Sequence, residues 1–160
     1  MNTWTRLSLV SSIIIVADQI TKYLIKANFG LHDNFVVIKN FFNITYVMNP
    51  GGAFGFFASG SPGVRKFIFL FLSSIVAIFV LWFYHRCARD FIFLSYGLAL
   101  IFAGALGNLI DRFQYGMVVD FLDFYIGSAH WPAFNVADSA ITVGMGILIY
   151  NILFNKIPDF

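Results

Sequence analysis

The chain has 160 residues, of which 59% are hydrophobic and only 11% are charged, whereas a soluble domain carries roughly 25% charged residues. A soluble monomer of this length cannot bury so much apolar surface, so the composition predicts an integral membrane protein. The net charge of +2 leaves no electrostatic footprint for nucleic acid. One cysteine and three scattered histidines provide neither an intramolecular disulfide nor the spacing of a metal site. We therefore expect no cofactor and no metal.

Four apolar stretches each approach the ~20 residues that a helix needs to cross about 30 Å of hydrocarbon. They are Leu7–Ile25, Phe67–Tyr84, Phe91–Ile110 and Phe134–Phe154, with two longer connecting segments, Lys26–Lys66 and Asp111–Ala133. The sequence thus predicts one membrane domain over residues 1–160, mainly α-helical, with four transmembrane helices. A cleaved signal peptide is the alternative for the N-terminus, but the apolar stretch continues past Asp18 without a small-residue cleavage site.

The basic residues nearest the spans indicate the orientation in the membrane, because cytoplasmic loops carry an excess of Lys and Arg. An even number of spans puts both termini on one side. The residues that assign this side to the cytoplasm are Arg6, Arg86, Arg89 and Lys156, while Arg65 and Lys66 fall on the other side and oppose the rule. We expect both termini in the cytoplasm and the two longer segments outside.

Three runs rich in β-branched and aromatic residues predict strands in these external segments. They are Phe35–Ile38, Phe41–Met48 and Met117–Ile126, and a turn sequence, Asn49–Gly55, follows the second. We expect a small extracytoplasmic β-sheet with a loop or flap, whose aromatic side chains rest near the lipid headgroups. For most of these aromatic residues a structural cap is the simplest role.

Asp18 and Lys22 lie four residues apart in the first span, on one helix face and in the order that favours an ion pair. Charged residues at membrane depth are functional candidates by default. The pair can be a proton relay or a structural ion pair, and its self-satisfying spacing favours the structural role.

Asn108 and Asp111 share a face at the end of the third span, and Arg112 follows directly. A guanidinium can bind a carboxylate or a lipid phosphate through two parallel hydrogen bonds. A carboxylate beside such a group stays ionised, so Asp111 is better suited to a scaffold than to general acid catalysis.

Asp120, Asp123 and Asp138 are the remaining candidates for acid–base chemistry. On a strand Asp120 and Asp123 point to opposite faces, so only one of them can face the helices together with Asp138. Two carboxyl groups held together in apolar surroundings keep one proton between them, which suits hydrolysis without a metal. The alternative is that Asp138 merely caps the fourth helix while Asp120 is solvated, and residue chemistry leaves both interpretations open.

Five blocks of this sequence together resemble the bacterial lipoprotein signal peptidases, the type II signal peptidases. The blocks are Asp18-Gln-Ile-Thr-Lys22, Asn49-Pro-Gly-Gly-Ala-Phe54, Gly104-Ala-Leu-Gly-Asn-Leu-Ile-Asp-Arg112, Val118-Val-Asp-Phe121 and Phe134-Asn-Val-Ala-Asp-Ser-Ala140. Their order, their spacing and the four-span plan all match that family. Pro50 and Gly52 occupy variable positions of the second block.

The resemblance implies an aspartic endopeptidase of the bacterial inner membrane, with its active site at the outer face. Such an enzyme removes the signal peptide from diacylglyceryl-modified prolipoproteins by cleaving before the lipidated cysteine. It further implies a monomer that contacts membrane lipids and is blocked by cyclic lipopeptides. The catalytic pair is then Asp120 and Asp138. The substrate-binding and supporting residues implied by the family are Asn49, Gly51, Ala53, Asn108, Asp111, Arg112, Asn135, Ala137, Asp18 and Lys22.

Two other classes of protein compete with this interpretation. A small ion-coupled transporter would use Asp18, Lys22 and Asp138 as a proton path. It requires polar residues through both leaflets, and the second span offers only Ser73 and Ser74. A purely structural membrane subunit would leave the polar blocks without a purpose.

Overall fold

Four long helices form the bulk of the protein in the computed structural model, which describes residues 1–51 and 61–154. They are α1 (Thr3–Asn28), α2 (Pro62–Cys87), α3 (Ile92–Tyr115) and α4 (Val136–Leu153). Each is long and apolar enough to cross a membrane, which confirms the predicted fold class. The helix α3 continues beyond Ile110, so Asp111 and Arg112 belong to its last turns and not to the external segment in which we expected them.

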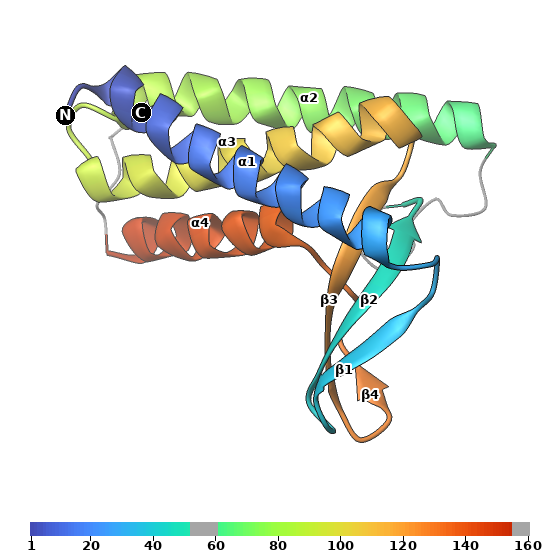
Figure 1. The fold of residues 1–160 in the computed structure, drawn as a ribbon. Coiled ribbons are helices and arrows are strands. Elements are labelled where there is room, and N and C mark those ends of the chain that lie inside the picture. Colours follow the sequence, from blue (N-terminus) through green and yellow to red (C-terminus); the bar gives the residue numbers. More distant parts are fainter. Residues whose placement is uncertain (52–60, 155–160) are drawn as a thin grey trace.

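The helix α3 is the central helix of the bundle and packs against α1, α2 and α4 (Figure 1). Small residues allow its close approach to α4, because side-chain atoms at these positions would overlap with the neighbouring helix. A Cβ atom on Gly104 would lie 2.3 Å from the carbonyl oxygen of Ala137, and one on Gly144 would lie 2.5 Å from that of Gly97. The start of α4 is therefore held directly against the middle of α3.

A four-stranded antiparallel sheet in the order β1-β2-β3-β4 projects from one end of the bundle (Figure 1). Its strands are β1 (Asn34–Ile38), β2 (Phe42–Asn49), β3 (Val118–Ile126) and β4 (Ala129–His130). The first three match the predicted strand runs within a residue or two, as expected from their β-branched and aromatic composition. The predicted flap contains Ala53, which lies outside the described residues.

The turn from α3 into β3 brings the sheet up against the helices. Gly116 follows the last helical residue with a φ of 71°, a left-handed conformation that glycine adopts without strain. The chain therefore leaves α3 abruptly and enters β3 at Val118. Because β2 pairs with β3 so that Val47 is opposite Asp120 and Asn49 is opposite Val118, the polar end of β2 reaches the same place.

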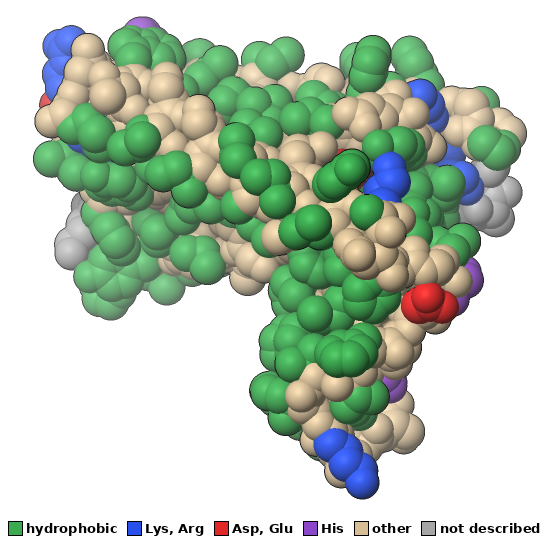
Figure 2. Space-filling view, viewed as in Figure 1, with side chains coloured by type: hydrophobic (Ala, Val, Ile, Leu, Met, Phe, Trp, Pro, Cys, Tyr) green, Lys and Arg blue, Asp and Glu red, His purple; other side chains and the backbone are tan. Residues whose placement is uncertain are grey.

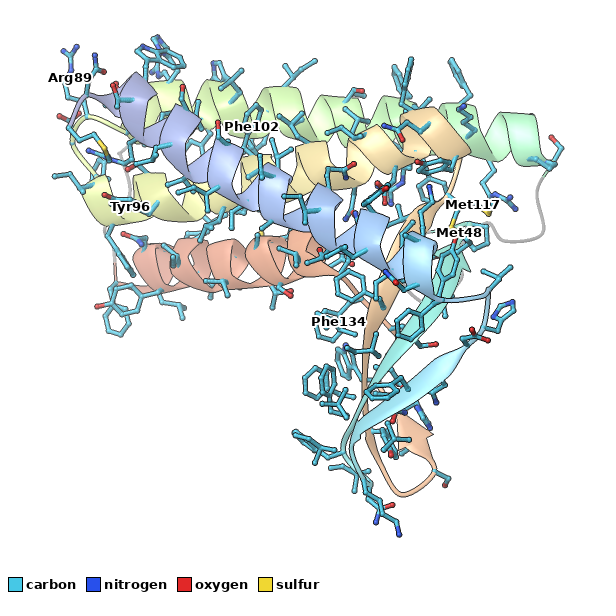
Figure 3. All side chains as sticks on the ribbon, in the orientation of Figure 1. Met48, Arg89, Tyr96, Phe102, Met117 and Phe134 are labelled. Carbon is cyan, nitrogen blue, oxygen red and sulfur yellow. The ribbon has the colours of Figure 1, made fainter. Side chains whose placement is uncertain are left out.

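The two ends of the bundle differ in their polar residues. At the end opposite the sheet, the guanidinium of Arg6 donates hydrogen bonds to the Ala88 carbonyl and to the Ser95 hydroxyl, joining α1 to the α2–α3 turn. Figure 3 shows Arg89 and Tyr96 at this end and Met48 and Met117 at the sheet end. On the face shown in Figure 2, the coloured side chains along the bundle between its ends are mostly hydrophobic, as expected for a surface that faces lipid. Lys156 lies outside the described residues.

Candidate active site

Asp120 and Asp138 line one cavity where the sheet meets the helices. Asp120 comes from β3 and Asp138 from the first turn of α4, and the cavity has a volume of about 630 Å³. The other predicted residues that line it are Asn49, Gly51, Asn108 and Arg112, and residues that the sequence analysis did not select complete the wall: Val118, Trp131, Pro132, Ala133, Phe134, Ser139, Ile141, Thr142 and Val143. The site thus combines a few polar groups with a largely apolar wall.

Asp120 is almost fully buried, with 2% of its surface exposed. Its two carboxyl oxygens accept hydrogen bonds from side-chain amides, Oδ2 from Asn49 at 2.9 Å and Oδ1 from Asn135 at 2.7 Å. Burial, followed by the neighbouring charge of Asp138, raises the pKa of Asp120 from 3.8 to about 7, against the opposing effects of these amides and of Lys22. A carboxyl group of this kind keeps a proton near neutral pH and is not solvated as the alternative interpretation required.

Asp138 both caps its helix and faces the cavity. Asn135 is the N-cap of α4 and accepts a hydrogen bond from the Asp138 backbone N–H, while Asp138 Oδ2 accepts one from the Asn135 backbone N–H at 3.3 Å. The other carboxyl oxygen of Asp138 accepts a 2.7 Å hydrogen bond from Asn108 Nδ2. The capping role and the acid–base role, which the sequence presented as alternatives, are therefore compatible in one residue.

Asn135 is fully buried and its side-chain amide is already engaged. Its Nδ2 lies within hydrogen-bonding distance of Asp120 Oδ1, the Val119 carbonyl and Asn108 Oδ1, and its Oδ1 accepts from Asp138. The two amide protons have partners within the protein, so they are not available as donors to a substrate. Asn135 instead joins the two aspartate-bearing segments.

Asp18 and Lys22 form the predicted ion pair, and Asp111 joins it. Lys22 Nζ lies 2.8 Å from Asp18 Oδ2 and 2.9 Å from Asp111 Oδ2, with all three side chains at most 3% exposed. Gln19, which the sequence analysis passed over although it lies within the first block, donates hydrogen bonds to both carboxylates. Asp111 therefore pairs with Lys22 and not with its neighbour Arg112, because on a helix adjacent side chains point in different directions.

The remaining predicted residues occupy distinct places around the cavity. The Arg112 guanidinium donates to the Asn108 carbonyl at 3.4 Å and lies over the ring of Phe69. Asn49 Oδ1 accepts from the Gly51 backbone N–H, which holds the start of the turn that follows β2. Ala137 is fully buried against α3. Ala53, for which we expected a supporting role, lies outside the described residues.

Asp123 lies on the opposite face of β3 from Asp120, as the alternation along a strand predicts. It accepts hydrogen bonds from Asn43 Nδ2 and from the ring of His130, both at 2.8 Å, and it does not line the described cavity. Asp120 and Asp138 are therefore the acidic residues of the cavity wall. Two such groups can share a proton, one acting as an acid and the other as a base.

Comparisons with known proteins identify the family of this chain. Residues 10–154 match the family model described as Signal peptidase (SPase) II. A lipoprotein signal peptidase of Desulforapulum autotrophicum is 63% identical over 99% of both chains, and one of Syntrophus aciditrophicus is 41% identical over 91% of this chain and 90% of its own. A solved bacterial membrane enzyme superposes with a TM-score of 0.83 at 36% identity, covering 94% of this chain and 88% of that one.

A second solved bacterial membrane enzyme gives a TM-score of 0.80 at 38% identity over 92% of both chains. The family match over residues 10–154 includes all five sequence blocks. The chain therefore belongs to the signal peptidase II family, the membrane proteases that remove signal peptides from prolipoproteins during lipoprotein maturation.

Proposed function

We propose that Asp120 and Asp138 are the catalytic aspartates of this protease. The observation that carries the proposal is that both carboxyl groups line the same cavity and that side-chain amides hold each of them. A buried and a half-buried carboxyl group facing one cavity ionise together only at a high cost, so the pair keeps one proton. The raised pKa of Asp120, about 7, supports a shared proton at neutral pH.

In the proposed reaction the ionised carboxylate takes a proton from a water molecule whose oxygen attacks the scissile carbonyl carbon. The protonated carboxyl group donates its proton to the carbonyl oxygen, which yields a neutral tetrahedral diol. The proton taken from water then passes to the peptide nitrogen as the C–N bond breaks. One hydroxyl of the diol returns its proton to the pair as the new carboxyl group forms, so the one-proton state is restored.

The proposed substrate is a prolipoprotein with a diacylglyceryl-modified cysteine, cleaved directly before that cysteine. Family membership supports this, and so does the shape of the cavity. Its wall extends from the sheet along α4 through Ile141, Thr142 and Val143, of which Thr142 and Val143 are exposed on the side of the bundle. A lipid-bearing chain can therefore enter from the bilayer without leaving hydrocarbon.

We further propose that the cavity faces the outer surface of the bacterial inner membrane and that both termini are cytoplasmic. The support is the gathering of Arg6, Arg86 and Arg89 at the end of the bundle opposite the sheet, together with the positive-inside rule. The enzyme acts as a monomer in contact with membrane lipids, and cyclic lipopeptides block it by occupying the cavity.

The deciding experiment is cleavage of a prolipoprotein by the purified chain in detergent. The diacylglyceryl-modified precursor and the same precursor without lipid serve as matched substrates, and we expect cleavage of the modified one only. Addition of a cyclic lipopeptide should stop the reaction. Equal cleavage of both precursors would contradict the proposed substrate, and failure to cleave either would contradict the proposed function.

A further inference from the structure

A buried ion cluster lies behind the cavity and contributes no side chain to the described wall. We call it the Lys22 cluster, and its members are Asp18, Gln19, Lys22 and Asp111. Their side chains join α1 to α3 through the two ion pairs of Lys22 and the hydrogen bonds of Gln19 at 3.1 Å. Burying charges this deeply costs free energy even when they are paired, so such residues at membrane depth are functional candidates.

Each carboxylate of the cluster also holds one backbone N–H group. Asp18 Oδ1 accepts a 2.9 Å hydrogen bond from Ala137, and Asp111 Oδ2 accepts a 3.0 Å hydrogen bond from Val119. Ala137 directly precedes Asp138 in the sequence, and Val119 directly precedes Asp120. The cluster therefore binds the backbone one residue before each of the two aspartates of the cavity.

Lys22 adds a third connection through Asn108. An ammonium group has three protons to donate and no acceptor. Besides the two carboxylates, Nζ donates to Asn108 Oδ1 at 3.1 Å. Because this cation faces the amide oxygen, the amide nitrogen must face the other way, where it donates to Asp138 Oδ1 at 2.7 Å. Lys22 thereby determines the orientation of the Asn108 amide, so that its nitrogen, and not its oxygen, faces Asp138.

We propose that Asp18, Lys22 and Asp111 are positioning residues. They set the distance between the carboxyl groups of the two catalytic aspartates and the orientation of these groups. This inference rests on the proposed catalytic role of Asp120 and Asp138. On the sheet side, backbone hydrogen bonds between Leu122 and Phe134 join β3 to the segment before α4. The Lys22 cluster makes the corresponding connection on the helix side, so the two aspartates are held from both sides.

The main test removes all three charges together, with the variant Asp18→Leu, Lys22→Met, Asp111→Leu. Because no buried charge is left unpaired, we expect its melting temperature (Tm) to exceed that of Lys22→Met alone. A displacement of about 1 Å in a catalytic group costs about 100-fold in rate, so kcat should fall about 100-fold. KM should stay close to the wild-type value, because the cluster does not contribute to the described cavity wall.

A second variant disturbs the cluster without changing any charge. A Cβ atom on Gly107 would lie 2.7 Å from Asp18 Oδ2 and 3.2 Å from the Cβ of Ala137. Gly107→Ala should therefore push the Asp18 carboxylate away from the Ala137 N–H and lower kcat at a nearly constant KM. Gly146→Ala is the matched control, because a Cβ atom on this α4 glycine meets no atom within 4 Å.

Arg6→Met controls for a general loss of stability. Arg6 is a buried cation in α1 that also joins distant helix ends, but it lies at the end of the bundle away from the cavity. We expect Arg6→Met to lower Tm while the kcat of the folded enzyme stays at the wild-type level.

The outcomes separate this inference from the proposed function. A folded triple variant with wild-type kcat, or a loss that appears only in KM, would overturn the positioning role. So would an equal fall in kcat in Arg6→Met. If the triple variant does not fold, full activity of Gly107→Ala overturns the inference and a fall in its kcat supports it. Activity in Asp120→Asn or Asp138→Asn, measured in parallel, would instead overturn the catalytic pair itself.

Discussion

Asp120 and Asp123 lie on the same strand, three residues apart, and have different surroundings. Asp120 faces the end of the helix bundle, where neutral amides of Asn49 and Asn135 hold it beside a second carboxyl group. Asp123 faces the other side of the sheet, where it contacts His130, whose side chain is 48% exposed. One strand thus presents the same residue type to two different environments.

The comparison shows that packing, and not residue type alone, raises the pKa of Asp120. At the junction of sheet and helices, Asp120 is buried and the donors around it are mostly neutral, so its ionisation is not fully compensated. At the projecting part of the sheet, Asp123 has an ionisable partner that reaches solvent. The junction between a membrane helix bundle and a polar strand is therefore where a proton can be retained at neutral pH.

The largest difference between the two regions should appear in catalysis. Asp120→Asn and Asp138→Asn each remove a group that must accept or donate a proton, so we expect kcat to fall by about 1,000-fold or more. Asp123→Asn, the matched control on the same strand, should retain nearly full activity. Cleavage of a lipid-modified prolipoprotein by each purified variant measures this. An inactive Asp123→Asn beside an active Asp120→Asn would reverse the assignment of the strand faces.

The ion pairs of the two regions should differ strongly in their contribution to stability. Removal of Lys22 leaves the carboxylates of Asp18 and Asp111 buried without their cation, so Lys22→Ala should cost about 3–5 kcal/mol. His130→Ala breaks a partly exposed contact and should cost at most about 1 kcal/mol. Thermal unfolding in detergent compares the two variants. Similar Tm losses would show that burial does not separate these ion pairs.

The Lys22 cluster also changes the expected behaviour of double variants. A simple Asp18–Lys22 pair predicts that Asp18→Leu with Lys22→Met restores most of the stability lost in Lys22→Ala. Because Asp111 shares the same cation, this double variant still leaves one carboxylate unpaired. We therefore expect only partial recovery, and full recovery only when Asp111 is replaced as well.

The retained proton of Asp120 predicts a pH dependence of activity. The folded-state pKa of about 7 lies above the ordinary 3.8, so the proton is present below this value and is lost as the pH rises through about 7. We expect kcat to decline over the same range, because a fully ionised pair has no acid. Asn49→Ala removes a hydrogen bond that lowers this pKa. The decline of kcat in this variant should therefore shift to higher pH. A shift to lower pH in the kcat profile would contradict the assignment.

The smallest effects are expected from reagents that act on other kinds of active site. Among residues 1–51 and 61–154, no group of three His, Cys or Asp side chains is arranged to hold a metal ion. Cys87 is fully buried in the last turn of α2. Chelators and thiol- or serine-directed reagents should therefore leave cleavage unchanged. Loss of activity in a chelator, reversed by zinc, would contradict an aspartic mechanism.

The sequence alone predicted the elements that depend on local composition and length. Four apolar stretches of spanning length are four helices, and runs of β-branched and aromatic residues are β1, β2 and β3. Helical spacing also indicated that Asp18 contacts Lys22 and that Asn108 shares a face with Asp111. These expectations succeed because hydrophobic length and periodicity act within one element.

Contacts between distant segments were decided only by the tertiary structure. Lys22 contacts Asp111, the side-chain amide of Asn135 donates to Asp120, and Gln19 donates to Asp111, all across separations that no periodicity describes. The close packing of α3 on α4 at Gly104 and the turn at Gly116 bring these segments together. Sequence spacing determines which side chains share a face, but only the packing of those faces determines which polar groups come into contact. The reason is that a buried donor forms its hydrogen bond with an acceptor that the packing places within reach.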